Sequence, residues 1–293
     1  MIRLSPEELT TPDLISAGQP TRLSGSPSAT LVTGQPNALE SIVIAKMTRR
    51  LVPLLVVCFF AAFLDRVNVS FAALTMNKDI GLSMSAYAFG AGVFFLTYFV
   101  FEIPSNLLLE RVGARVWITR IMLTWGVLSA ANAFVRGPVS FYAVRALLGA
   151  AEAGFFPGII FFLTLWFPEV YRARVVSGFM MALPLSTVVG APISGAVLGL
   201  DGVGGLDGWR WLFITEAVPS IVLAVAVFFF LTDRPQAATW LDDDERRWLV
   251  GRLDVERHAR EARGHFTVLE ALVDPRILMF SAVYFGLTGR TMA

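Results

Sequence analysis

The sequence predicts an all-α membrane protein, and three observations support this fold class. Of the 293 residues, 55% are hydrophobic and only 16% are charged, whereas soluble domains are about 25% charged. The mean hydropathy is +0.64. Apolar runs long enough to cross a bilayer as helices recur along the chain. The net charge of +1 is not the signature of a nucleic-acid binder, so the expected partner is the lipid bilayer and not a nucleic acid.

Six apolar runs predict six complete transmembrane helices, joined by short polar or glycine-rich loops. The fifth run contains no charge and is rich in glycine and proline, which allow close approach of a neighbouring helix and bending. The six runs cover residues 51–73, 85–109, 116–135, 138–166, 175–200 and 211–232.

The N-terminal segment differs in composition from the bundle that follows it. Residues 1–45 are rich in Ser, Thr, Pro and Gly and lack the apolar segment of a signal peptide. They are expected to form a disordered cytoplasmic tail. The alternative is that translation begins at Met47. Residues 46–232 then form the six-helix transmembrane bundle.

The polar stretch after the bundle, residues 233–275, predicts a cytoplasmic central loop. Asp242 and Glu245 have the spacing of a capping box. The apolar residues behind them, beginning with Trp248, predict an amphipathic helix on the membrane surface. The last apolar run, residues 276–293, predicts a truncated seventh transmembrane helix.

The distribution of basic residues predicts the orientation in the membrane. Cytoplasmic loops of membrane proteins carry an excess of Lys and Arg, and the loops on the side of the N-terminus carry that excess here. We therefore expect a multi-pass protein of the inner (plasma) membrane with a cytoplasmic N-terminus. Before the central loop, the inside holds Lys46, Arg49, Arg50, Arg111, Arg115, Arg172 and Arg174, and the outside holds Lys78, Arg136 and Arg210.

Two charges inside the fourth run are the first candidate site residues. In RALLGAAEAGFFPG, Arg145 and Glu152 are separated by nearly two helical turns, so they share one helix face roughly 10 Å apart along the axis. Charges within a membrane span are costly, face a protein interior or a wet cavity, and are functional hypotheses by default. The alternative is a purely structural Arg145–Glu152 pair that locks two helices together.

Polar residues inside other runs extend this set. Asp65, Arg66 and Asn68 lie in the first run, within FLDRVNVSFA, and Tyr98 lies in the second run. Glu216 lies near the outer end of the sixth run, where we expect an interfacial or capping group rather than a site residue.

A loop motif introduces a family resemblance. NLLLERVGAR contains Glu110, Arg111, Gly113 and Arg115, and it resembles the loop 2–3 signature of the major facilitator superfamily. Six helices, a long central loop and a seventh helix resemble the N-terminal half of a transporter of that superfamily. FLDRVNVSFA and RALLGAAEAGFFPG resemble its anion:cation symporter branch, which includes tartrate, phthalate and sugar-acid permeases. This resemblance covers about residues 39–287.

The resemblance implies a proton-coupled symporter of small organic carboxylates such as tartrate. Its partners would be an organic anion, protons and a C-terminal half that completes the fold. The resemblance also implies that Asp65, Arg66, Arg145 and Glu152 line the central cavity, and that the NLLLERVGAR loop takes part in conformational change.

The chemistry of the same residues agrees with this assignment. Arg66 and Arg145 stay charged and can bind a carboxylate through two parallel hydrogen bonds. Asp65 and Glu152 are the candidate proton carriers, because a proton-coupled cycle needs a carboxyl group that is neutral in one conformation and charged in another.

Other interpretations remain at this point. Asn68 and Tyr98 either donate neutral hydrogen bonds to the substrate or join helices to each other. The chain has no zinc-site, P-loop or dinucleotide motif, so we expect no metal, no cofactor and no enzymatic activity. The competing classes are a channel or membrane enzyme, and a truncated, non-transporting half of a permease that needs its C-terminal half.

Overall fold

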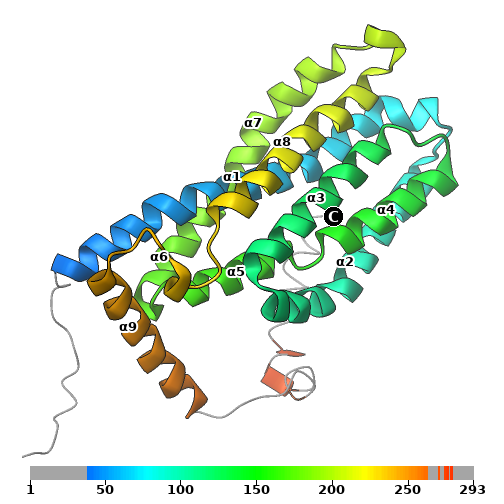
Figure 1. The fold of residues 1–293 in the computed structure, drawn as a ribbon. Coiled ribbons are helices and arrows are strands. Elements are labelled where there is room, and N and C mark those ends of the chain that lie inside the picture. The colour runs from blue at the N-terminus through cyan, green and yellow to red at the C-terminus, as the bar shows by residue number, and fades with distance from the viewer. Residues whose placement is uncertain (1–37, 263–269, 271–273, 277, 280–293) are drawn as a thin grey trace, which may run out of the picture. The chain divides into compact units, whose positions relative to one another are not determined.

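The computed structural model describes residues 38–262, 270, 274–276 and 278–279, and every regular element among them is a helix (Figure 1). Most of the expected tail and of the expected seventh helix therefore lies outside the described residues. The elements are α1 (Ala38–Asp79), α2 (Met84–Val112), α3 (Ala114–Asn132), α4 (Pro138–Glu152), α5 (Phe155–Trp166), α6 (Glu169–Met180), α7 (Ala182–Leu198), η1 (Val203–Gly205), α8 (Gly208–Phe230), η2 (Pro235–Ala237) and α9 (Asp243–Glu261).

The first helix is longer than the apolar run that predicts it. It begins at Ala38, so residues 38–45 are helical rather than disordered as expected. The reason is packing, because the side chains of Val43 and Met47 are fully buried and belong to the main hydrophobic core. The helix also continues past the apolar run as far as Asp79.

The fourth predicted helix is interrupted and becomes α4 and α5. Ala153 has extended backbone angles, and Gly154 adopts a left-handed conformation with φ 84°, which glycine tolerates without steric cost. A side chain at Gly154 would overlap the hydroxyl group of Ser105 on α2. The run 175–200 likewise becomes α6 and α7, which meet at Met181.

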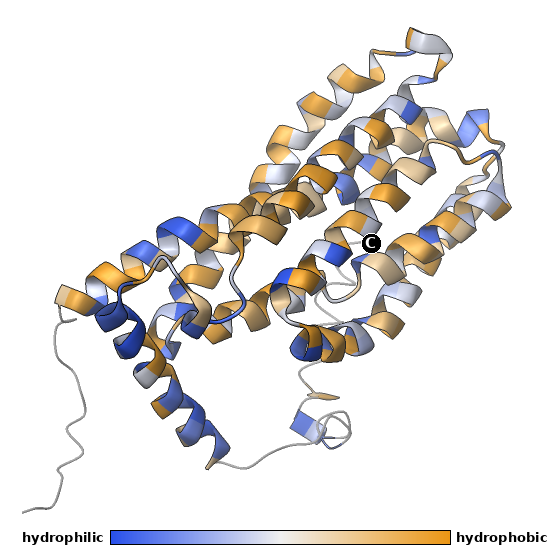
Figure 2. Cartoon of the chain, viewed as in Figure 1, coloured by the Kyte–Doolittle hydropathy of each residue, from blue (hydrophilic) through white to orange (hydrophobic). Residues whose placement is uncertain are grey.

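Five helical stretches are long and apolar enough to cross a membrane. They correspond to the first, second, fourth, fifth and sixth predicted spans. The described α3, which corresponds to the third predicted span, is not among them and carries Arg115 and Arg120. It nevertheless packs along α8 and buries Trp125 completely. Figure 2 shows apolar residues along these helices and hydrophilic residues concentrated on α9.

The helices pack in neighbouring pairs that are distant in sequence. Helix α2 lies against α4, α3 lies against α8, and α1 lies against both α7 and α8. Glycines permit two of these approaches, because a side chain at Gly149 would overlap the carbonyl oxygen of Phe94, and one at Gly126 would crowd Ile221. Helix α4, which carries Arg145 and Glu152, is thereby held beside α2 and α3, and α1, which carries Asp65 and Arg66, is held beside α7 and α8.

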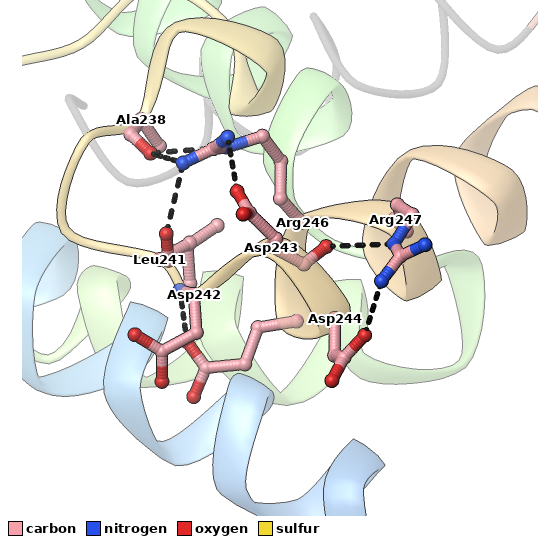
Figure 3. Close-up of polar contacts among 8 residues, drawn as sticks. Ala238, Leu241, Asp242, Asp243, Asp244, Arg246 and Arg247 are labelled. Carbon is pink, nitrogen blue, oxygen red and sulfur yellow. Dashed lines mark hydrogen bonds and ion pairs between the residues drawn. The ribbon is translucent and has the colours of Figure 1, made fainter.

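The expected helix of the central loop is present as α9, with the predicted capping box between Asp242 and Glu245. Figure 3 shows Arg246 at this end, donating to the carbonyl oxygens of Ala238 and Leu241 and so tying the preceding segment to the helix.

The same end of α9 is attached to α1 by an ion pair. The Nζ atom of Lys46 lies 2.7 Å from Oε2 of Glu245. Burial by itself would raise the pKa of Glu245, but hydrogen bonds from Lys46 and from the Asp242 backbone, together with the charge of Lys46, outweigh it and lower this pKa below its usual range.

Candidate functional site

Four of the sequence-predicted residues meet in one place between α1 and α4. Asp65 and Arg66 from α1, and Arg145 and Glu152 from α4, line a cavity of about 160 Å³ together with residues of α2. Asp65, Arg145 and Glu152 are buried, whereas the side chain of Arg66 is 31% exposed. The structure therefore places two cations and two carboxylates around a single space.

Glu152 pairs with Arg66 and not with Arg145. The Nη2 and Nε atoms of Arg66 lie 3.0 Å and 3.2 Å from Oε2 of Glu152. The other carboxylate oxygen, Oε1, has no hydrogen-bond partner within the described residues. The structural pair considered from the sequence, Arg145 with Glu152, is thus replaced by a pair that joins α1 to α4.

Arg145 is a buried cation whose charge is not neutralised by direct contact. It is 7% exposed, and among the described residues it makes no ion pair, while its Nε atom has no hydrogen-bond partner. Its guanidinium group instead lies 4.7 Å from the centre of the Phe94 ring, a distance typical of a cation–π contact. Gly149, one turn further along α4, allows the Phe94 backbone to approach this closely.

Asp65 faces the cavity but takes its hydrogen bonds from α3. The indole nitrogen of Trp125 donates to Oδ2 at 3.2 Å, and the hydroxyl group of Ser129 donates to Oδ1. Two donors of this kind stabilise the charged form of a carboxylate. Asp65 therefore links the cavity to the interface between α1 and α3.

A second cavity, of about 200 Å³, is also lined by Arg66 and is mainly aromatic. Tyr98 lines it, and the Arg66 guanidinium lies 5.1 Å from the Tyr98 ring and 5.5 Å from the Phe63 ring. The Arg66 guanidinium therefore contacts both a carboxylate and aromatic rings.

Asn68 is placed away from these two cavities. It is fully buried, and its Oδ1 accepts a hydrogen bond from the hydroxyl group of Ser194 on α7. This is the interhelical hydrogen bond that was the alternative to a contact with substrate.

The loop motif between α2 and α3 is built around Gly113. Gly113 has φ 100° and ψ 148°, a combination that is essentially restricted to glycine. A side chain there would lie 3.0 Å from Oδ1 of Asp233, which accepts a hydrogen bond from the backbone N–H of Arg115. Asp233 therefore caps the first turn of α3 from the end of the sixth span. Glu110 and Arg111 are exposed at the end of α2.

Two functional candidates were missed from the sequence. Asp233 was assigned only to the polar stretch that follows the sixth run, residues 233–275. Glu216, expected at an interface or a cap, is buried inside α8 and neither of its carboxylate oxygens has a partner within the described residues. The signal that could have found Glu216 is its position within the sixth apolar run and not in the loop before it, because a charge within a span is a functional hypothesis by default.

Comparisons with known proteins agree with this fold. The family model described as Major Facilitator Superfamily matches residues 55–292. An Agrobacterium vitis protein named "Putative tartrate transporter" is 54% identical over 248 residues, covering 85% of this chain and 57% of its own length. An Acinetobacter baumannii protein named "Quinolone resistance transporter" is 41% identical and covers 85% of this chain and 57% of its own length.

A solved structure shows the same arrangement of helices at low sequence identity. A bacterial homologue of the human lysosomal transporter Spinster, in an inward-facing and unoccupied conformation, matches with a TM-score of 0.59 and 19% identity. The match covers 70% of this chain and 45% of that protein. The chain thus spans about half the length of the relatives that it matches.

Proposed function

The chain belongs to the major facilitator superfamily, and we propose that it supplies the N-terminal half of a proton-coupled symporter of small organic carboxylates such as tartrate. Its fold is the six-helix N-terminal half of the superfamily fold, and it is a multi-pass membrane protein. The name of the Agrobacterium vitis relative supports the substrate class. A site between two such halves is the usual basis of alternating access in this fold.

The observation that carries the proposal is the free buried cation, Arg145. A charge buried without a partner is costly. Such a group is therefore expected where a ligand of opposite charge binds to it. A substrate carboxylate can pair with Arg145, because the two parallel N–H donors of the guanidinium group match the two carboxylate oxygens. The arginine also remains charged at every physiological pH, so the affinity for the anion does not depend on protonation of Arg145 itself.

The pair between Arg66 and Glu152 suggests how proton and substrate are coupled. While Glu152 is ionised it occupies the donors of Arg66. When Glu152 takes a proton, its oxygen no longer carries the charge that holds Arg66, and the donors become available to a substrate carboxylate. Proton binding and anion binding then favour each other, which is the requirement for symport. Asp65 is the second proposed proton carrier.

Transport in proteoliposomes tests this proposal. The full-length transporter that contains residues 1–293 would be reconstituted, and uptake of labelled tartrate would be followed with and without an inwardly directed proton gradient. We expect accumulation only with the gradient, and competition by other small dicarboxylates. Uptake that is unaffected by a protonophore, or that prefers uncharged sugars, would overturn the proposal.

A second candidate is that the 293-residue polypeptide by itself does not transport. Several large apolar side chains of α2, among them Phe95 and Phe99, are more than half exposed, and nothing among the described residues covers them. The polypeptide expressed alone should give no accumulation, and co-expression of a C-terminal half from a relative should restore it. Accumulation by the purified, reconstituted polypeptide alone would refute this candidate.

We also propose that the N-terminus is cytoplasmic, because basic residues are concentrated on that side of the spans. In a Cys58→Ala background, a cysteine introduced at Gly205 should react with an impermeant maleimide added outside intact cells. A cysteine at Val255 should react only after permeabilisation. The reverse pattern would invert the topology.

A further inference from the structure

Glu216 is a buried carboxyl group that the cavity described above does not use. It lies in α8, it is 6% exposed, and among the described residues no donor contacts either of its two oxygens. Its environment is closed by α1, α3 and α7, which pack against α8. This burial is produced entirely by the described residues.

The register between α3 and α8 places Glu216 near Asp65. Two contacts show that the helices run antiparallel. Gly126 of α3 approaches Ala217 of α8. Further along the chain, just after α3, the carbonyl oxygen of Ala133 accepts a hydrogen bond from Arg210, which precedes Ala217 on α8. Glu216 lies between these two contacts, on the stretch of α8 that faces Ser129. Ser129 in turn donates its hydroxyl hydrogen to Asp65.

No cation among the described residues faces Glu216. Helix α7 contains no charged residue, and α1 contributes only Asp65 at this level. The two arginines of α3 are engaged elsewhere, because Arg115 lies over Phe228 and Arg120 over Trp117. Within the described part of the chain, the only charged neighbour of Glu216 is therefore another carboxyl group.

Two adjacent carboxyl groups in a closed apolar environment cannot both be ionised, because each charge opposes the other. The hydrogen bonds decide which one carries the charge. Asp65 accepts bonds from Trp125 and Ser129, whereas Glu216 accepts none from the described residues. An ionised carboxylate without donors would be the more costly state.

We propose that Glu216 is an intramembrane proton-binding site, which holds a proton in this conformation beside an ionised Asp65. The site lies at the interface of α1, α3 and α8 and not in the substrate cavity, so it goes beyond the symport proposed above. Asp65 connects the two places, since it lines the cavity and also accepts a hydrogen bond from Ser129 on α3, the helix that packs against α8.

Infrared spectroscopy of the full-length transporter in lipid nanodiscs tests this inference, because a protonated carboxyl group absorbs separately from a carboxylate. At neutral pH and without substrate, the spectrum should contain a protonated-carboxyl band that Glu216→Gln removes. The matched control is Glu152→Gln, which should leave that band, because Glu152 is held by Arg66. A band unchanged by Glu216→Gln would overturn the proposal.

Asp65→Asn covers the case in which Glu216→Gln does not fold. The band should persist in Asp65→Asn, because the proton resides on Glu216, and its loss would place the proton on Asp65 and refute the assignment. This measurement needs neither substrate nor transport. A failure of proton-driven uptake would therefore count against the proposed function and leave this site unaffected.

Discussion

Glu152→Gln is the sharpest test of coupling in the proposed transporter. The substitution keeps the shape of the side chain and removes its charge. In the structure Glu152 binds Arg66 through two charge-assisted contacts, at 3.0 Å and 3.2 Å, both to Oε2. Without the negative charge, Arg66 should be available to the substrate carboxylate at every pH.

The magnitude follows from those contacts. A hydrogen bond to a charged group contributes about 1.5–3 kcal/mol, and the 31% exposure of the Arg66 side chain favours the low end of that range. Since 1.4 kcal/mol is about a tenfold change in affinity, we expect the apparent affinity for substrate at neutral pH to rise about tenfold. Accumulation driven by a proton gradient should be abolished, because a permanently neutral residue cannot link the two fluxes.

Counterflow and proton-driven uptake, measured side by side in proteoliposomes, separate these effects. Glu152→Gln should retain counterflow and lose accumulation against a gradient. The matched control is Glu169→Gln at the start of α6, because the Glu169 side chain is exposed and makes no ion pair within the described residues. If Glu152→Gln still accumulates substrate at the wild-type level, Glu152 is not the coupling residue and its pair with Arg66 is structural.

Three further changes test separate parts of the structure. Arg145→Lys keeps the charge but loses the planar fork, so half-saturation in counterflow should rise about 10-fold or more; an unchanged value would remove Arg145 from the binding site. Gly113→Ala should destabilise by about 1–3 kcal/mol and lower Tm, whereas Gly92→Ala, in open space, should not. Because the folded pKa of Glu245 is lowered, its contribution to stability is complete above the usual glutamate range and is lost as pH falls through the folded pKa. Protease cleavage near α9 should therefore increase below about pH 4, and Glu245→Gln should reduce that increase.

The membrane class and the main site residues could be predicted from the sequence because the signals are local. An apolar run of about 20 residues indicates a transmembrane helix whatever its neighbours are. A charge inside such a run is costly and therefore indicates a functional or paired residue. Arg66, Arg145 and Glu152 were identified in this way, and the structure brings them to one cavity.

Helix ends and interruptions were predicted less well because they depend on packing. The extension of α1 to Ala38 depends on the burial of Val43 and Met47. The break before α5 depends on the contact between Gly154 and Ser105. Neither contact can be read from the hydrophobic pattern, since each joins residues of different elements.

Only the tertiary structure decided which charges are paired. Because Arg145 and Glu152 share one face of one helix, the sequence allowed an ion pair between them. In the structure Glu152 bonds instead to Arg66 on α1, and Arg145 has no ion pair within the described residues. Glu216, which the sequence placed near an interface, is buried by α1, α3 and α7. The physical reason is the same in each case: the polarity of a residue is a property of the sequence, but its partners and its distance from water are set by which helices lie beside it.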